Sequence, residues 1–183
     1  EQDLVLHGYH IRAYRVQHNV PCYGYCIEIP RSGRFDAAAA SALGLPVQTW
    51  NRLQKGETIL WEDKEYAPDM VMGPPRKGIK VAYCTDTRPI DRIADNAKGA
   101  DLFICEGMYA EPDKLAKAKQ YKHMTFYEAA ELAKKAEVKQ MWLTHFSPSL
   151  VGAKGYMKDV KRIFAESYLG EDGKMLELDF LEE

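Results

Sequence analysis

The sequence predicts an α/β domain, in which helices pack against a sheet. Between residues 79 and 170, short runs rich in β-branched and aromatic residues alternate with segments of helical periodicity. The first thirty residues contain further extended runs, separated by turn-forming residues. Hydrophobic residues make up 46% of the 183 residues and aromatic residues 11%, which is enough for a packed core and excludes a disordered chain.

The N-terminal part is predicted to be extended. Its breaks fall at His7-Gly8 and at Asn19-Val20-Pro21, which are turn-forming sequences. We interpret His7 and His10 as ordinary strand or turn residues. The β-rich runs between the breaks are residues 4–6, 11–16 and 23–29.

Residues 30–78 have a different character. They contain an Ala-rich helical piece at residues 36–43, several glycines and prolines, and a polar stretch that ends in Gly-Pro-Pro-Arg-Lys-Gly at residues 73–78. So long a segment with weak periodicity is typical of a functional loop or arm rather than of a core. We therefore expect an inserted arm at about residues 37–72.

The rest of the chain alternates strand and helix. Pro89 suits the start of a helix, and Gly170 suits a helix C-cap. The predicted helices are residues 89–98, 126–137 and 156–169. The predicted strands are residues 80–84, 101–105, 140–143 and a last one at 175–181.

Charge and cysteine content restrict the class of protein. Lys plus Arg number 25 and Asp plus Glu 27, so the net charge of −2 excludes a generic nucleic-acid-coating protein but allows a local basic patch. The four cysteines form no C-x-x-C pair, so we expect free thiols in a reducing cytoplasm rather than a zinc ribbon. No apolar run approaches the roughly 18 residues of a membrane span, so no membrane partner is expected.

Ionisable residues follow the predicted strands at the points where they end. Asp86, Glu106 and His145 each come at or just after a strand, and ligands of α/β sheets gather at the carboxyl ends of strands. Carboxylates and imidazoles are ligands for divalent metals. Taken singly, Asp86 also suits a helix N-cap and His145 a structural histidine. Together they favour a site.

Two further histidines fit this site. His18 ends an extended run before a turn, and His123 lies just before a predicted helix. The free N–H groups at a helix entrance favour anions, so His123 is well placed to act on a phosphate group.

Several motifs occur in an order and spacing that together resemble the C-terminal portion of ribonuclease Z, the tRNA 3′-processing endonuclease of the metallo-β-lactamase superfamily. They run from about residue 18 to the C-terminus. They are Gly33-Arg34-Phe35-Asp36, Leu53-Gln54-Lys55-Gly56-Glu57-Thr58, Gly73-Pro74-Pro75, Asp86-Thr87-Arg88-Pro89, Cys105-Glu106-Gly107, His123-Met124-Thr125 with Glu128-Ala129-Ala130, and Leu143-Thr144-His145-Phe146-Ser147.

This resemblance implies the C-terminal part of a metallo-β-lactamase αβ/βα sandwich with an inserted arm. It implies a zinc-dependent endoribonuclease that cleaves the 3′ trailer of precursor tRNA with two zinc ions. His18, Asp86 and His145 look like metal ligands, with Asp86 bridging both ions. His123 is similar to the family's catalytic histidine, and Glu106 to the acid that orients it.

The sequence departs from the family pattern in two ways. Met124 stands where Ser is common after the catalytic histidine. The family's H-x-H-x-D-H motif is absent from the chain, which starts at Glu1. We therefore expect a fragment or a trimmed sequence that lacks an N-terminal half and is inactive alone. The resemblance also implies a cytoplasmic homodimer.

The family's arm grips the tRNA elbow, and residues 37–72 look like that arm. Arg52 and Lys55, near Trp50, are candidates for contact with the RNA backbone, because phosphate binding needs cations. A solvated surface loop is the alternative. The run of Lys114, Lys117, Lys119 and Lys122 suits either RNA steering or an ordinary exposed helix face.

Two other functions remain open at this point. One is a metallo-β-lactamase-fold phosphodiesterase with a different substrate. The other is a non-catalytic half-domain that serves as a scaffold. Against the scaffold, the chain carries a full set of ionisable candidates for which a scaffold has no physical need: His18, Asp86, Glu106, His123 and His145.

Overall fold

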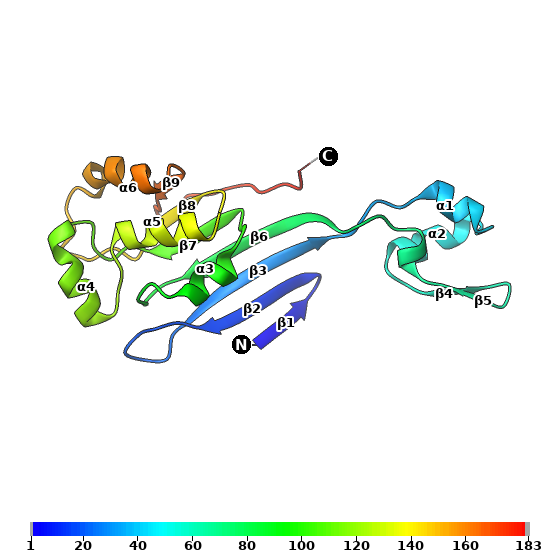
Figure 1. Cartoon of the computed structure of the whole chain (residues 1–183), viewed down its shortest axis with the longest axis horizontal. Helices are drawn as coiled ribbons and strands as arrows, with labels where there is room; N and C mark the ends of the chain where they lie inside the picture. Colours follow the sequence, from blue (N-terminus) through cyan, green and yellow to red (C-terminus); the bar gives the residue numbers. More distant parts are fainter. Residues whose placement is uncertain (1, 182–183) are drawn as a thin grey trace. The chain divides into compact units, whose positions relative to one another are not determined.

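A computed structural model describes residues 2–181 and shows a mixed α/β architecture (Figure 1). Within these residues, the main sheet has seven strands in the order β1-β2-β3-β6-β7-β8-β9. The α/β class predicted from the sequence is confirmed. The strands are β1 (Gln2–Leu6), β2 (Tyr9–Arg15), β3 (Tyr23–Arg31), β6 (Arg76–Cys84), β7 (Leu102–Glu106), β8 (Met141–Thr144) and β9 (Ser167–Leu169).

Strand direction changes across the sheet. β1, β2 and β3 pair antiparallel, whereas β6, β7, β8 and β9 pair parallel. In the parallel half, Cys84 is opposite Cys105 and Glu106 is opposite Thr144. The carboxyl ends of β6, β7 and β8 therefore meet at one edge of the sheet, as the strand-end argument requires.

Helices cover one face of this sheet. Alternate strand residues such as Tyr14, Cys84 and Phe103 are fully buried in a core shared with α5 (Phe126–Lys135). The buried alanines of α5 let the helix backbone approach the sheet closely. The other helices of this part are α3 (Asp91–Ala97), α4 (Leu115–Tyr121) and α6 (Met157–Ile163), with 3₁₀ turns η2 (Pro112–Lys114) and η3 (Ala153–Tyr156).

The opposite face of the sheet is exposed and apolar over β1, β3 and β6, whereas Leu102 of β7 and Trp142 of β8, which also point to it, are buried. Strand residues that alternate with the buried ones point to this face, because side chains alternate along a strand. Leu4, Tyr25, Ile27 and Tyr83 are 55%, 42%, 40% and 42% exposed. We call this surface the open sheet face.

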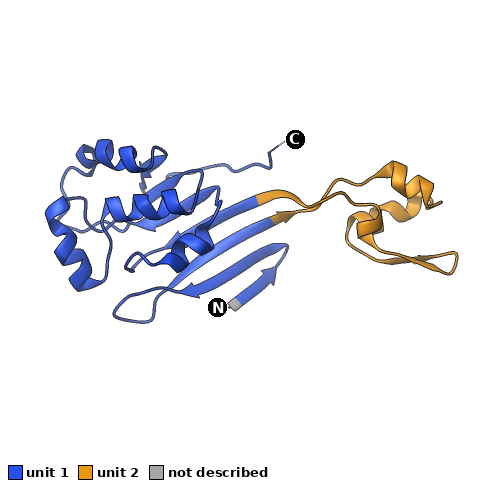
Figure 2. Ribbon diagram, viewed as in Figure 1, with its two compact units in different colours: residues 1–29, 79–183 blue, residues 30–78 orange. Residues whose placement is uncertain are grey.

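Residues Pro30–Gly78 form a separate compact unit, drawn in orange in Figure 2. It contains α1 (Ala37–Ala42), α2 (Val47–Gln54), a 3₁₀ turn η1 (Pro68–Met70) and a hairpin of β4 (Ile59–Trp61) and β5 (Lys64–Tyr66). The unit has its own buried cluster of Ala40, Leu45, Leu53, Ile59 and Val71.

The expectation of a coreless loop at residues 30–78 is therefore wrong in part. Asp36 caps α1 by accepting a hydrogen bond from the Ala39 N–H, and the rings of Phe35 and Trp50 pack 5.2 Å apart. The helix predicted at residues 36–43 is present, whereas α2 and the hairpin were missed. Short elements that alternate this quickly give too few residues for a periodic pattern.

Two predictions near the C-terminus are wrong. The helix predicted at residues 156–169 ends at Ile163, and Ser167–Leu169 form β9, because pairing with β8 outweighs the local helical pattern. Gly170 does not cap a helix. Its N–H donates to the Leu143 carbonyl at 2.7 Å, and a Cβ there would lie 2.6 Å from Cγ2 of Thr144.

The strand predicted at residues 175–181 is also absent, since none of these residues lies in a strand. An alternating pattern alone does not form a strand, because a strand needs the regular hydrogen bonds of a ladder. The helix α4 is present where the spacing of the lysine run suggested an exposed helix face. All four cysteines are free thiols, as expected. None of the helices among residues 2–181 is long and apolar enough to cross a membrane.

Candidate metal centre

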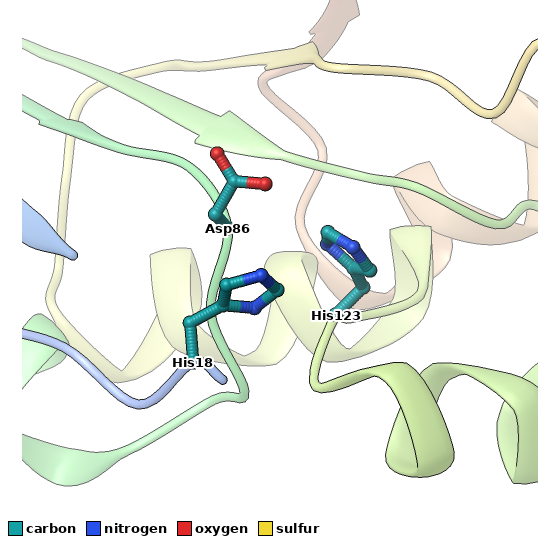
Figure 3. Close-up of side chains that lie close together, drawn as sticks. All are labelled: His18, Asp86 and His123. Atoms are coloured by element: carbon teal, nitrogen blue, oxygen red, sulfur yellow. The ribbon is translucent and has the colours of Figure 1, made fainter. Parts of the chain in front are cut away.

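Five predicted site residues meet at the carboxyl edge of the parallel strands. Asp86 follows β6 by two residues, Glu106 ends β7, and His145 directly follows β8. His18 comes from the connection between β2 and β3, and His123 from the turn between α4 and α5. The side chains of His18, Asp86 and His123 lie close together in Figure 3. Segments distant in the sequence thus converge on one point.

The donor atoms are dense enough to hold metal ions. The ligand atoms of His18, Asp86 and His123 all lie within 4.8 Å of one another, as do those of Glu106, His123 and His145. Nε2 of His145 is 3.5 Å from Oδ1 of Asp86, which links the two groups. His123 belongs to both groups. Its ring lies 5.0 Å from that of His18 and 5.5 Å from that of His145.

Glu106 lies beneath this cluster and is fully buried. Its carboxylate accepts hydrogen bonds from the backbone N–H groups of Thr87 and Met124, and its Oε2 lies 3.1 Å from Nδ1 of His123. Burial raises the pKa of Glu106 to about 8, although the two backbone donors oppose the shift. This carboxylate is inaccessible to a large substrate and is placed to orient His123.

His123 is held in a form that suits metal binding or proton transfer. Burial lowers the pKa of His123, and the neighbouring His18 and His145 lower it further. A lowered pKa favours the neutral imidazole, which has a lone pair on one ring nitrogen. Metal ligation requires this deprotonated form.

His18 is oriented by the main chain. Its Nδ1 lies 3.1 Å from the carbonyl oxygen of Lys122. A carbonyl only accepts, so Nδ1 carries the proton and Nε2 keeps the lone pair. The N–H of Gln17 donates to Oγ1 of Thr87 at 3.0 Å, which places the residue before His18 against the segment after β6.

The backbone is in an unusual conformation at two of the strand ends. Asp86 and His145 have φ values of 49° and 55°, in the left-handed region that few residues with a Cβ adopt. Such conformations cost of order 1–3 kcal/mol each and cluster at functional sites. The sharp turn after each strand brings Asp86 and His145 within reach of one another.

The structure decides between the local interpretations left open by the sequence. Asp86 is not a helix N-cap, because α3 begins at Asp91 with Ile90 at the cap position. His145 contacts Asp86 and is 36% exposed, so it is not a buried structural histidine. The side chains of His7 and His10 are exposed in the β1–β2 turn and in β2.

The predicted RNA-contact residues lie in the Pro30–Gly78 unit. Arg52 pairs with Glu57 at 2.8 Å in an exposed ion pair, and Lys55 is exposed at the end of α2. Lys55 also lines a surface depression with Gly33, Leu53 and Pro74. In the other unit, the ammonium of Lys117 lies 5.4 Å from the centre of the Tyr109 ring, at the start of the lysine run.

Two residues that contact the site were not among the predicted site residues. The Arg88 guanidinium donates to the His123 carbonyl oxygen and pairs with Glu128. A sequence signal existed for Glu128, since Thr125-x-x-Glu128 before an apolar run is a capping-box pattern. No pattern in the sequence indicates the contacts of Arg88.

The chain is similar to known proteins over its whole length. A family model described as the beta-lactamase superfamily domain matches residues 70–146. The chain is 60% identical over 185 residues to a ribonuclease Z of Agathobacter rectalis and 56% identical over 183 residues to one of Lachnospira eligens. Both relatives are named ribonuclease Z, and the chain is similar to them along its whole length. These two matches cover 100% of this chain but 61% and 60% of the relatives, so the chain spans about three-fifths of their length.

Solved structures agree on the fold. The metallo-beta-lactamase fold protein YhfI from Bacillus subtilis matches with a TM-score of 0.61 and 20% identity, over 96% of this chain and 52% of that one. The short form of human tRNase Z matches with a TM-score of 0.57 and 18% identity, over 97% and 46%. The chain has the metallo-β-lactamase fold, as the sequence motifs predicted.

Proposed function

We propose that the complete protein is a zinc-dependent endoribonuclease that removes the 3′ trailer from precursor tRNA. The similarity to relatives named ribonuclease Z along the whole chain supports the reaction class. The convergence of His18, Asp86, His123 and His145 above the buried Glu106 is the observation that carries the proposal.

The donor set fits zinc. Neutral imidazoles and carboxylates are the nitrogen and oxygen ligands that zinc takes, and the two overlapping donor groups suit two ions. We assign His18, Asp86 and His145 as the ligands, with Asp86 shared between both ions. When bound, zinc lowers the pKa of a water molecule and stabilises negative charge on a phosphodiester.

The role that we propose for His123 is proton donation to the departing oxygen. Glu106 fixes Nδ1 of His123 from below, which leaves Nε2 to face the strand edge. To donate from Nε2, His123 must first take up a second proton against its lowered pKa, and positioned acids contribute about 10²–10⁴-fold to the rate. Because His123 also belongs to both donor groups, a ligand role is the competing assignment.

Zinc content and activity of two variants separate these roles. In the complete protein, His145→Ala should lose zinc and precursor-tRNA cleavage together. His123→Ala should keep its zinc and lose about a hundredfold or more in rate. Zinc loss in His123→Ala would make His123 a ligand instead. If the wild-type protein carries zinc but does not cleave precursor tRNA, precursor tRNA is not its substrate and this part of the proposal is wrong.

We further propose that the remaining part of the protein carries the H-x-H-x-D-H ligands and packs on the open sheet face. Three assigned ligands are too few for two four-coordinate ions. The exposed apolar side chains of Leu4, Tyr25, Ile27 and Tyr83 form a surface that a second layer would bury.

This part of the proposal has a direct test. Residues 1–183 expressed alone should bind little zinc and cleave no RNA, and co-expression with the remaining segment as a separate chain should restore both. Full zinc binding by residues 1–183 alone would contradict it. The intact mass of each purified chain, 20.8 kDa for residues 1–183, verifies which chain is present.

The Pro30–Gly78 unit is the part that we propose as the RNA-gripping arm, with Arg52 and Lys55 at the RNA backbone. A compact unit with exposed cations suits shape-based contact with a folded RNA. Cytoplasmic location and a homodimer, in which one subunit's arm presents RNA to the other subunit's site, complete the proposal. Sedimentation of the complete protein tests the dimer.

A further inference from the structure

We propose that Arg88 is a positioning residue, which fixes the main chain at His123 against the segment that carries Asp86. This inference rests on the catalytic role proposed for His123. Arg88 is a largely buried arginine beside the candidate metal centre, and it has no part in the proposed reaction. The side chain of Arg88 is 14% exposed and that of Glu128 is 21% exposed.

Arg88 makes a forked set of contacts. Its guanidinium donates through Nη1 and Nη2 to the two carboxylate oxygens of Glu128, and the Nη1–Oε2 distance is 3.2 Å. Nη1 also donates to the carbonyl oxygen of His123. A buried guanidinium requires such partners, because an unpaired buried charge is strongly destabilising. The planar fork of arginine serves both partners at once, which the single ammonium of lysine does not.

Glu128 is itself held on a helix, so the fork has a rigid base. Its Oε2 accepts a hydrogen bond from the Thr125 N–H at 2.9 Å, and its own N–H donates to Oγ1 of Thr125 at 3.2 Å. This capping box fixes Glu128 at the first turn of α5. Arg88 therefore holds the His123 carbonyl relative to the start of a packed helix.

The segment from Asp86 to Arg88 connects the other parts of the site as well. The Thr87 N–H donates to Glu106, which in turn contacts the His123 ring. The Arg88 N–H donates to the Gln17 carbonyl at 2.9 Å, next to His18. Among the hydrogen bonds identified in residues 2–181, only the one from Arg88 connects this segment directly to the His123 main chain. Loss of the Arg88 guanidinium removes this connection.

A loosened His123 should slow the reaction without weakening substrate binding. Misplacement of a reacting group by about 1 Å costs on the order of 10²-fold in rate. In the complete protein, we expect Arg88→Lys to lower kcat for precursor tRNA by about 10–100-fold. KM and zinc content should stay within about twofold of wild type, because Arg88 belongs to neither donor group.

A second variant keeps the test valid if Arg88→Lys unfolds. Glu128→Gln retains the capping box, since glutamine serves at this position, but weakens the charged pair with Arg88. We expect a kcat loss of about 3–10-fold and a lower melting temperature, because the buried Arg88 loses its charged partner but keeps a neutral acceptor. Circular dichroism at the assay temperature checks that this variant is folded. Arg162→Lys is the matched control, because the Arg162–Asp159 pair on α6 is exposed and distant from the site residues in sequence. It should leave kcat unchanged.

A readout that needs no activity separates this proposal from the proposed function. Long-range ¹H–¹⁵N spectra of the histidine rings report the hydrogen bond at Nδ1 of His123. Arg88→Lys and Glu128→Gln should shift the His123 signals and leave those of His10 in place. If the wild type fails to cleave RNA while these shifts occur, the function fails and the positioning role stands. Unchanged His123 signals, or unchanged kcat in both variants of an active enzyme, would overturn the positioning role.

Discussion

The metal centre and the Pro30–Gly78 unit hold their charged side chains in opposite ways. At the metal centre, Glu106 is fully buried and Arg88 is 14% exposed, and each makes several hydrogen bonds to the main chain or to a fixed partner. In the Pro30–Gly78 unit, Arg52 and Glu57 are 58% and 49% exposed and form a simple pair, and Lys55 lies at the surface.

Under the proposed function, this difference suits two different requirements. Bond cleavage needs groups held to within about 0.5 Å, which buried and cross-linked residues provide. Contact with an RNA backbone needs cations at the surface but tolerates loose geometry, since phosphates are evenly repeated and carry no sequence information. Changes at the metal centre should therefore affect every substrate, whereas changes in the Pro30–Gly78 unit should affect only large RNA substrates.

The largest effect is expected at Asp86, the residue that we assign to both metal ions. In the complete protein, Asp86→Ala should lower the rate about a thousandfold or more, which corresponds to about 4 kcal/mol of transition-state stabilisation. The loss should be similar for precursor tRNA and for the small diester bis(p-nitrophenyl) phosphate. Asp159→Ala on the exposed face of α6 is the control. If Asp86→Ala kept its zinc and its activity, the assignment of Asp86 as a metal ligand would be wrong.

The next effect concerns the Pro30–Gly78 unit as a whole. Its two chain ends lie together, because the Asp36 N–H donates to the Val71 carbonyl and the Gly73 N–H to the Arg34 carbonyl, both at 2.7 Å. Residues 40–70 can therefore be replaced by a short Gly-Ser linker. Cleavage of precursor tRNA should fall about a hundredfold or more, with the diester rate within about twofold of wild type. Equal loss of both activities would make the unit structural and would favour a phosphodiesterase with another substrate.

A smaller effect is expected from loosening the unit from within. Leu53 is fully buried in its small core, and Leu53→Ala should cost about 2–5 kcal/mol. So small a core should then open on its own, so hydrogen exchange should rise across residues 30–78 while the metal-centre unit stays protected. Exchange that rises equally in both units would show that they unfold together, which would end the proposed division between them.

The sequence specified the site better than it specified the folding of residues 30–78. Asp86, Glu106 and His145 were predictable because parallel strands carry their last residues to one edge, and the structure brings all three there. The contacts of Arg88 were not predictable, because they depend on where the turn before α5 lies in space. Residues 167–169 form a strand for the same reason, since their partner β8 is distant from them in sequence.

The smallest effects are expected from single cations of the Pro30–Gly78 unit, and they test how loosely this unit works. Lys55→Ala should weaken precursor-tRNA binding by a few fold. It should also reduce the slope of log K against log salt concentration by about one, which is the contribution of one phosphate contact. Arg52→Ala should do less, because Glu57 already neutralises part of the Arg52 charge. Lys158→Ala, an exposed lysine on α6, should change neither quantity. If Lys55→Ala instead lowered kcat with an unchanged salt slope, this region would act on the chemistry itself, and the contrast with the metal centre would be wrong.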